Sequence, residues 1–409
     1  MNGTSTRLGA LLLLLSGNML IDALEVSTLA VALPAIGADF GLSPSATSWF
    51  MTGFAAGFGG SILLGNWLTD RYGRRQVYLY ALLGFAVASV LAAVAQDPYL
   101  LAATRVVKGV CVAFTAPTGV AIIARTFPEG ATRNRALAVY SLFGASGFSV
   151  GLLRSGALTE VSWRWTLFVS GPAALLLYLA GLRIIPRDRP TPAAASGRGD
   201  DPGAIAVLTR PGLLRSAGGA AALNGGLWGI LLLATYEFQT GLGWSPLVTG
   251  LALLPTSVPL AVSAVHMGRV VGRVGAARLI LAGSLAAFAG FFWYAVAGPE
   301  HGYLIGVLPA VSGIGVGMML SFSALHVQAV SGVTPGRQAL ATGLYQTSVQ
   351  IGGGLVLALV AAAALAGRSL ATAVVVAVSA AGLLIAVSGS VTGQRDRERR
   401  ASWTQSRSM

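Results

Sequence analysis

Six ionisable residues lie inside long apolar segments of this sequence. They are Asp22, Glu25, Arg105, Lys108, Arg154 and Glu237. Asp22 and Glu25 are one helical turn apart, and so are Arg105 and Lys108, so the members of each pair share a helix face. A carboxylic acid in apolar surroundings favours its neutral form, whereas a neighbouring cation favours the charged form. Two acids and two bases with this spacing could therefore bind and release a proton.

Two interpretations of these residues are open. Asp22 or Glu25 could carry the proton while Arg105 tunes it, because ionisable residues within a membrane are functional by default. Alternatively, the four residues form buried salt bridges that only orient helices. Arg154 and Glu237 lie near the outer ends of their segments, where they could form an outer gate, contact a charged substrate or simply extend toward the interface.

The elements that position these residues are predicted to be helices in a lipid bilayer. Of the 409 residues, 55% are hydrophobic and 10% are charged, whereas soluble domains carry about 25% charged residues. The apolar segments are about 20 residues or longer, which is the length of a spanning helix and not of a barrel strand. The sequence therefore predicts an all-α integral membrane protein with twelve spans. Their approximate ranges are 8–34, 46–69, 76–95, 99–123, 136–158, 163–185, 214–240, 246–267, 276–297, 302–325, 338–364 and 369–390.

A polar segment rich in proline and charge separates the sixth span from the seventh. It predicts an N-terminal six-helix bundle at 1–185, a cytoplasmic linker at 186–211, a C-terminal six-helix bundle at 212–392 and a basic cytoplasmic tail at 393–409. Most of the 27 lysine and arginine residues lie in alternate loops, in the linker and near the two ends of the chain. By the positive-inside rule, we expect both termini in the cytoplasm.

The loop between the second and third spans is short and highly charged. Residues 65–75 read Gly-Asn-Trp-Leu-Thr-Asp-Arg-Tyr-Gly-Arg-Arg. Charge is costly at membrane depth, so this segment must leave the bilayer. Its Arg-Tyr-Gly at 71–73 has a weaker echo, Arg-Val-Gly, at 273–275 after the eighth span. The echo indicates two related halves, an architecture found in secondary transporters.

The chain resembles members of the major facilitator superfamily, and among them the drug:proton antiporters. Residues 65–75 are similar to the superfamily's signature between helices 2 and 3. Residues 105–109 (Arg-x-x-Lys-Gly) are similar to the helix 4 signature, with lysine where glutamine is usual. Residues 25–34, with glutamate where aspartate is usual, and residues 162–165 and 241–255 resemble segments of the fourteen-helix drug-exporter branch. The resemblance implies the major facilitator fold, with two pseudo-symmetric six-helix bundles.

Two features depart from that branch. The chain has a polar linker where the branch has two extra helices, and the helix 5 antiporter signature is degraded at 151–156, with Arg154 inserted. The resemblance implies a secondary active transporter that exports a hydrophobic or amphipathic small molecule, such as a drug, antibiotic or metabolite, by proton antiport through alternating access. The degraded signature leaves open a proton-coupled importer of a small organic solute. A non-transporting membrane sensor with the same fold is a third interpretation.

The resemblance also implies a cytoplasmic gate in the loop between helices 2 and 3. Its residues are Gly65, Asp70, Arg71, Gly73, Arg74 and Arg75. We expect Asp70 to pair with an arginine, across to helix 11 as the resemblance implies, and the glycines to allow a tight turn and close helix approach. The alternative is that the positive charge only fixes the topology.

Composition and motifs argue against several other classes. The net charge of +13 is spread between apolar segments, so we expect no nucleic-acid partner. Cys111 is the single cysteine and the three histidines lie in separate segments, so we expect no metal site. No nucleotide-binding motif is present, so we expect a proton gradient as the energy source and no cofactor. We expect a monomeric, non-enzymatic protein of a bacterial inner membrane, whose partners are protons, lipid and a small-molecule substrate.

Overall fold

A computed structural model describes residues 2–187 and 206–407, and the regular structure in these ranges is helical. The first half contains α1 (Asn2–Phe40), α2 (Pro44–Tyr72), α3 (Arg74–Ala93), α4 (Pro98–Thr126), α5 (Ala131–Thr159), α6 (Trp163–Phe168) and α7 (Ser170–Ile184). The second half contains α9 (Pro211–Tyr236), α10 (Pro246–Leu253), α11 (Val258–Val274), α12 (Ala276–Val296), α13 (Leu308–Val330), α14 (Gln338–Ala364) and α15 (Arg368–Arg407).

The described residues include eleven segments that are long and apolar enough to cross a membrane. One of these crossings consists of α6 and α7, and another of α10 and α11. The helix α2 has 29 residues and is a twelfth helix of sufficient length. The all-α membrane architecture predicted from the sequence is confirmed.

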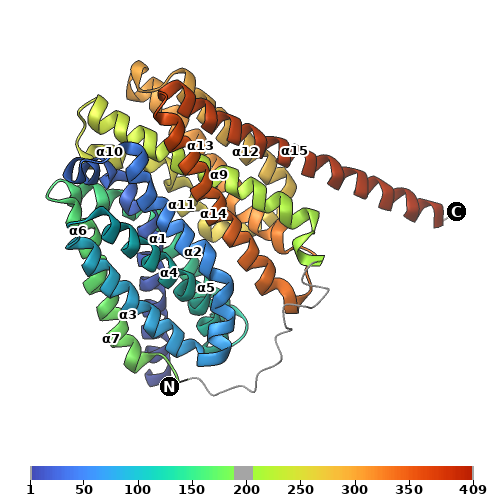
Figure 1. Cartoon of the computed structure of the whole chain (residues 1–409). Helices are drawn as coiled ribbons and strands as arrows, with labels where there is room; N and C mark the ends of the chain where they lie inside the picture. The colour runs from blue at the N-terminus through green and yellow to red at the C-terminus, as the bar shows by residue number, and fades with distance from the viewer. Residues whose placement is uncertain (1, 188–205, 408–409) are drawn as a thin grey trace.

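The helices form two bundles that lie side by side (Figure 1). In the first half α1 packs on α5 and α2 packs on α4, while in the second half α12 packs on α13 and α9 packs on α14. The two halves meet where α2 contacts α14 and where α5 contacts α10 and α11. Most of the expected linker lies outside the described residues, and α15 continues as a helix through most of the expected tail.

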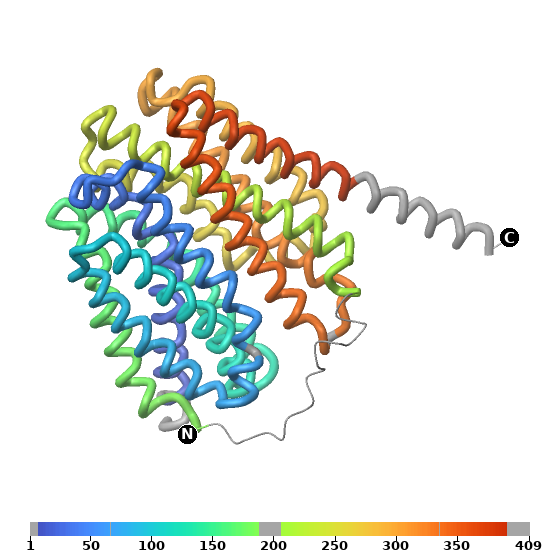
Figure 2. The backbone as a smooth tube through the Cα atoms, in the orientation of Figure 1, coloured from blue at the N-terminus to red at the C-terminus, as the bar shows by residue number. Residues whose placement is uncertain are grey.

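The two ends of the molecule differ in charge. The end of α7 lies at one end of the molecule (Figure 2), together with the last turns of α2, α4 and α11, which hold Arg71, Arg125 and Arg273. We call this the arginine end. The opposite end, where α1 is followed by α2 and α9 by α10, is called the far end. The four ionisable residues of α1 and α4 lie between these two ends.

The first helix is longer than the sequence predicts. The expected end was Pro34, but α1 continues to Phe40 with Pro34 inside it. A proline within a helix removes one backbone hydrogen bond, a loss that membrane helices tolerate when their neighbours satisfy the freed groups. Glu25 therefore lies about 22 Å along the helix from its far end, and not the roughly 14 Å expected from an end at Pro34.

Prolines and glycines also set other helix boundaries. The segment expected as one helix at 246–267 consists of α10, a 3-10 turn at Leu254–Thr256 and α11, which ends at Val274. Gly73 ends α2 with φ 84° and ψ 148°, and Gly275 ends α11 with φ 92° and ψ 141°. The matching conformations show that the sequence echo between the halves is also a structural one.

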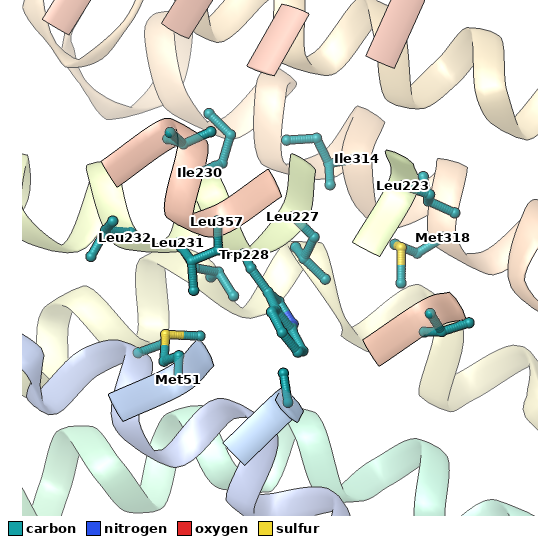
Figure 3. Close-up of a cluster of buried hydrophobic side chains, with 14 of the residues drawn as sticks. Met51, Leu223, Leu227, Trp228, Ile230, Leu231, Leu232, Ile314, Met318 and Leu357 are labelled. Carbon is teal, nitrogen blue, oxygen red and sulfur yellow. The ribbon is translucent and has the colours of Figure 1, made fainter. Parts of the chain in front are cut away.

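Apolar side chains fill the seam between the halves (Figure 3). Trp228 of α9 is 1% exposed, and its ring points toward α2. Met51 of α2 and Leu357 of α14 belong to the same buried cluster. The buried acids and bases of α1 and α4, described next, lie within the first half.

Candidate functional site

The helices α1 and α4 run in opposite directions and bring the acids to the bases. On α4, Arg105, Lys108 and Thr115 lie along one helical stripe. That stripe faces Glu25 and Asp22 on α1. Each of these five side chains is at most 3% exposed.

Glycines allow the close helix packing around this stripe. A Cβ atom on Gly109 of α4 would lie 2.2 Å from the carbonyl oxygen of Phe54 on α2. A Cβ atom on Gly151 of α5 would lie 2.1 Å from Ser27 Oγ on α1. Only glycine fits at contacts this close, so Gly109 lets α2 pack against α4, and Gly151 lets α5 pack against α1.

Glu25 is the most extensively paired of the four residues. Its Oε2 lies 2.6 Å from both Arg105 Nη1 and Lys108 Nζ. Its Oε1 accepts a hydrogen bond of 2.8 Å from Ser170 Oγ of α7. Arg105 also donates to the backbone carbonyls of Glu25, at 3.1 Å, and of Phe50, at 3.3 Å. Two cations and a hydroxyl therefore surround one carboxylate.

Asp22 has different surroundings. Its Oδ2 accepts hydrogen bonds from Asn18 Nδ2 at 3.0 Å and from Thr115 Oγ1 at 2.7 Å. Both donors are neutral, and Asp22 has no ion pair within the described part of the chain. The four residues do meet at one helix contact, but both bases pair with Glu25.

Arg154 lies inside the first half and extends this network. It donates to Ser170 Oγ at 3.0 Å and to Thr28 Oγ1 at 2.8 Å. Since Ser170 in turn donates to Glu25, Arg154 is linked to the α1–α4 cluster through one hydroxyl. The side chain therefore faces the bundle interior and does not extend toward the interface.

Glu237 lies in the other half, in a π-helical turn at Glu237–Gly241 that follows α9. Its Oε1 is 2.7 Å from Arg368 Nε, and its Oε2 accepts a hydrogen bond of 2.5 Å from the hydroxyl of Tyr294. Arg154 and Glu237 thus have separate partners in separate halves.

The expected gate residues lie at the arginine end, in the last two turns of α2, at Gly73 and in the first turn of α3, so the expected loop is reduced to Gly73. Asp70 is exposed and forms no ion pair with any described residue. The Arg71 guanidinium lies 5.7 Å from the ring centroids of Trp67 and Tyr72. The expected pairing of Asp70 with the eleventh spanning helix, which is α14, is therefore absent from this conformation.

The four remaining residues of the expected gate differ in what they do. Gly73 adopts a φ of 84°, as a tight turn requires. A Cβ atom on Gly65 would make only ordinary contact, 3.5 Å from the Phe114 ring of α4, so the helix approach at this position does not require glycine. Arg74 begins α3, and Arg75 donates to the Leu182 carbonyl of α7 at 2.5 Å.

Polar contacts join the two halves at the far end. The hydroxyl of Tyr236 on α9 lies 2.7 Å from Thr47 Oγ1 of α2 and 3.3 Å from the Leu33 carbonyl of α1. Gln239 Nε2 donates to the Val31 carbonyl at 2.9 Å. The second half therefore hydrogen-bonds to α1 and α2 where these helices approach the far end.

Glu160 forms a further contact between the halves. It follows α5, and its Oε1 accepts a 3.0 Å hydrogen bond from the backbone N–H of Leu247 in the first turn of α10. Hydrogen bonds from the Ser245 hydroxyl and the Leu247 N–H lower the pKa of Glu160. A negative charge at a helix N-terminus is also favoured by the helix dipole.

Sequence reasoning missed three participants. Thr115 could have been found, because it continues the Arg105–Lys108 stripe along α4. Arg368 could also have been found, because it is one of few basic residues expected near the far end. A basic residue there is a natural partner for Glu237, which was expected near the same end. Ser170 gave no signal, since its link between Arg154 and Glu25 depends on how α7 packs.

Comparisons with known proteins relate this chain to one family of membrane proteins. The family model described as Major Facilitator Superfamily matches residues 15–357. The puromycin resistance protein pur8 of Streptomyces alboniger is 33% identical, and the match covers 85% of this chain and 80% of that protein. The cephamycin export protein CmcT of Amycolatopsis lactamdurans is 30% identical, and the match covers 87% of this chain and 84% of that protein.

A solved structure has the same fold. A mutant of the nucleoside transporter NupG superposes with a TM-score of 0.73 at 13% identity, covering 92% of this chain and 98% of the other. Similarity at this level of identity shows the fold alone. The fold, the family model and relatives named for drug resistance and antibiotic export together show that this chain belongs to the major facilitator superfamily of transporters.

Proposed function

We propose that this chain exports a hydrophobic or amphipathic small molecule in exchange for protons, by alternating access. Relatives named for puromycin resistance and cephamycin export support the direction of transport. The observation that carries the proton coupling is the contrast between two buried acids one turn apart. Glu25 faces two cations, whereas Asp22 accepts hydrogen bonds from neutral groups.

Asp22 is the proton carrier in this mechanism. A buried carboxylate without a cation has a large desolvation cost, and binding a proton removes it. Both hydrogen bonds to Asp22 end on Oδ2, so Oδ1 can hold the proton while both bonds remain. The proton leaves when a conformational change brings water or a cation to the carboxyl group.

Glu25 and Arg105 have a different part. Arg105 connects the Glu25 carboxylate, the Glu25 backbone and the Phe50 carbonyl, so it ties α4 to both α1 and α2. Arg154 adds α5 to the same network through Ser170. This network sets the position of α1, and hence of Asp22, as the first half moves as a unit.

The inter-half contacts support a state that is closed at the far end. Tyr236, Gln239 and Leu247 of the second half bond to the first half there. At the arginine end Asp70 is exposed and unpaired among the described residues. In the proposed cycle, the Asp70 contact forms as the arginine end closes and the far-end contacts break.

The arrangement of charge supports an orientation with the arginine end in the cytoplasm. Both termini and the linker then lie on the cytoplasmic side of a bacterial inner membrane, in agreement with the positive-inside rule. The proposed transporter acts as a monomer, is driven by the proton gradient without a cofactor and has no nucleic-acid partner. Its substrate site lies between the halves, as in other transporters built from two repeats.

Transport into inside-out vesicles tests this proposal. Vesicles from cells that lack their own drug pumps are given an acidic lumen and labelled puromycin, with a cephamycin as a second probe. We expect the wild-type protein to accumulate the drug. Asp22→Asn should lose gradient-driven accumulation but keep the exchange of labelled for unlabelled drug, because exchange needs no net proton movement.

Glu129→Gln is the matched control, since Glu129 is 87% exposed at the arginine end and should not affect coupling. Full gradient-driven accumulation by Asp22→Asn would reject Asp22 as the carrier. Drug loss from wild-type vesicles under the same gradient would indicate import. A protein that moves neither drug with or without a gradient would support the sensor interpretation over transport of these compounds.

A further inference from the structure

We propose that Lys108 is a second proton carrier of the transport cycle. This inference rests on the proposed antiport, in which Asp22 carries one proton and Lys108 has no task. Lys108 is the single lysine of the chain and is 0% exposed. It stands where the superfamily's helix 4 signature usually has a neutral glutamine, so this chain carries an additional titratable group at that position.

The two bases around Glu25 are coordinated very differently. Arg105 donates to three oxygen atoms and lies 4.8 Å from the Phe54 ring, so its charge is fully accommodated. Lys108 Nζ contacts one carboxylate oxygen, which it shares with Arg105, and lies 4.7 Å from the Phe85 ring. The 2.6 Å approach to Glu25 lacks hydrogen-bond geometry, and Nζ has no other polar partner among the described residues.

The charges around Lys108 do not balance. The titratable and charged groups near it are Glu25 and Asp22 on α1, Arg105 and Cys111 on α4, and Arg154 on α5. Glu25 alone offsets three cations when Asp22 is protonated. Arginine keeps its proton in proteins, whereas a buried lysine exchanges its proton readily. Lys108 is therefore the base that can remove the excess charge.

Lys108 releases its proton to water in a single step. One N–H bond of the Lys108 ammonium breaks, its electron pair stays on Nζ, and the proton passes to a water molecule that enters as the helices move. The product is a neutral amine, and Glu25 keeps its ion pair with Arg105, so the contact between α4 and α1 persists. In the reverse step the amine takes a proton from water and the cluster regains one positive charge.

A nuclear magnetic resonance experiment on the intact protein tests this directly. Labelling lysine with 15N at Nζ gives one side-chain signal, because the chain contains one lysine. In lipid nanodiscs, we expect this signal to change between ammonium and amine within about pH 5 to 8, the range in which folded proteins are usually most stable. An ammonium signal throughout that range would overturn the proposal. The experiment needs no substrate, so its result is independent of whether antiport is found.

Two variants extend the test to transport. Lys108→Gln removes the proton but not the polar side chain, and it should lower the number of protons exchanged per drug molecule by one, as measured from reversal potentials. Lys108→Arg keeps the charge but cannot release it, and it should slow turnover strongly while the protein still folds. An unchanged proton ratio in Lys108→Gln would refute the second carrier and leave the role of Asp22 intact. Loss of all proton coupling in the wild type would instead refute the antiport itself.

Discussion

At the scale of single residues, two acids one turn apart differ in the charges that surround them. Glu25 neutralises Arg105 and Lys108, and its removal would leave both cations buried without a carboxylate. Breaking a buried pair in this way typically costs about 3–5 kcal/mol. Asp22 has no cation, so replacing its carboxyl with an amide of the same shape leaves no charge unpaired.

We therefore predict that Glu25→Gln lowers the free energy of unfolding by about 3 kcal/mol or more, whereas Asp22→Asn changes it by less than about 1 kcal/mol. Thermal and denaturant unfolding of the purified proteins in one detergent would measure both. Equal destabilisation by the two variants would contradict the contrast between their environments. Glu129→Gln serves again as the surface reference.

The sequence identified the charged residues of the site but not how they pair. Helical spacing placed Asp22 with Glu25 and Arg105 with Lys108, and the structure brings both pairs to one contact. The choice of partner depends on the rotation and depth of α1 against α4. Both depend on how α4 packs on α2 at Gly109 and on how α1 packs on α5 at Gly151. The periodicity of a single helix does not predict such contacts between helices.

At the scale of helices, small residues decide how closely the charged segments can approach. A Cβ atom on Gly109 would lie 2.2 Å from the Phe54 carbonyl oxygen, so alanine must push α4 away from α2. A Cβ atom on Gly60 of α2 would meet nothing within 4 Å. The same substitution is therefore expected to act in opposite directions at two helical positions.

Gly109→Ala should destabilise the protein by about 1–3 kcal/mol, because overpacking forces backbone shifts. Gly60→Ala should be neutral or stabilise it by up to about 1 kcal/mol, because alanine favours the helix. Unfolding midpoints of both variants, measured side by side, test this prediction. A stable Gly109→Ala protein with unchanged transport would show that the α2–α4 distance is not critical.

Some helix ends were predicted correctly from the sequence and others were not. Residues 338–364 were expected as a helix and form α14 with those bounds. Pro34 misled the prediction, because neighbouring helices in a bundle allow α1 to continue through it. The break at Pro255 was missed because hydropathy is unchanged across the turn between α10 and α11. Periodicity therefore found the crossings but not their internal interruptions.

At the scale of the whole molecule, the two ends of the seam are held differently. The far end has hydrogen bonds from the second half to α1, α2 and Glu160. Gly156 of α5 also lies against α10, where a Cβ atom would be 2.9 Å from Leu247 Cα. Breaking these contacts is the step that any opening at the far end requires, so each is a control point for the conformational equilibrium.

Glu160 makes this equilibrium dependent on pH. Its pKa is lowered when it bonds to Ser245 and Leu247, so the contact is favoured above the ordinary glutamate pKa of about 4.3. The contact is lost as the pH falls through the lowered value, since the protonated group no longer bears the charge that the α10 N-terminus favours. Acidification below about pH 4 should therefore shift the equilibrium toward the state that is open at the far end.

At neutral pH, Glu160→Gln should reduce the closed-to-open ratio by about two- to five-fold, which corresponds to a helix-dipole contribution of about 0.3–1 kcal/mol. Spin labels at the exposed positions Ala157 of α5 and Leu251 of α10, in a Cys111→Ser background, would report the distance between the halves. The wild-type distance distribution should shift toward longer distances on acidification, while that of Glu160→Gln should respond much less. Identical pH responses in the two proteins would exclude Glu160 as the group that couples far-end closure to pH.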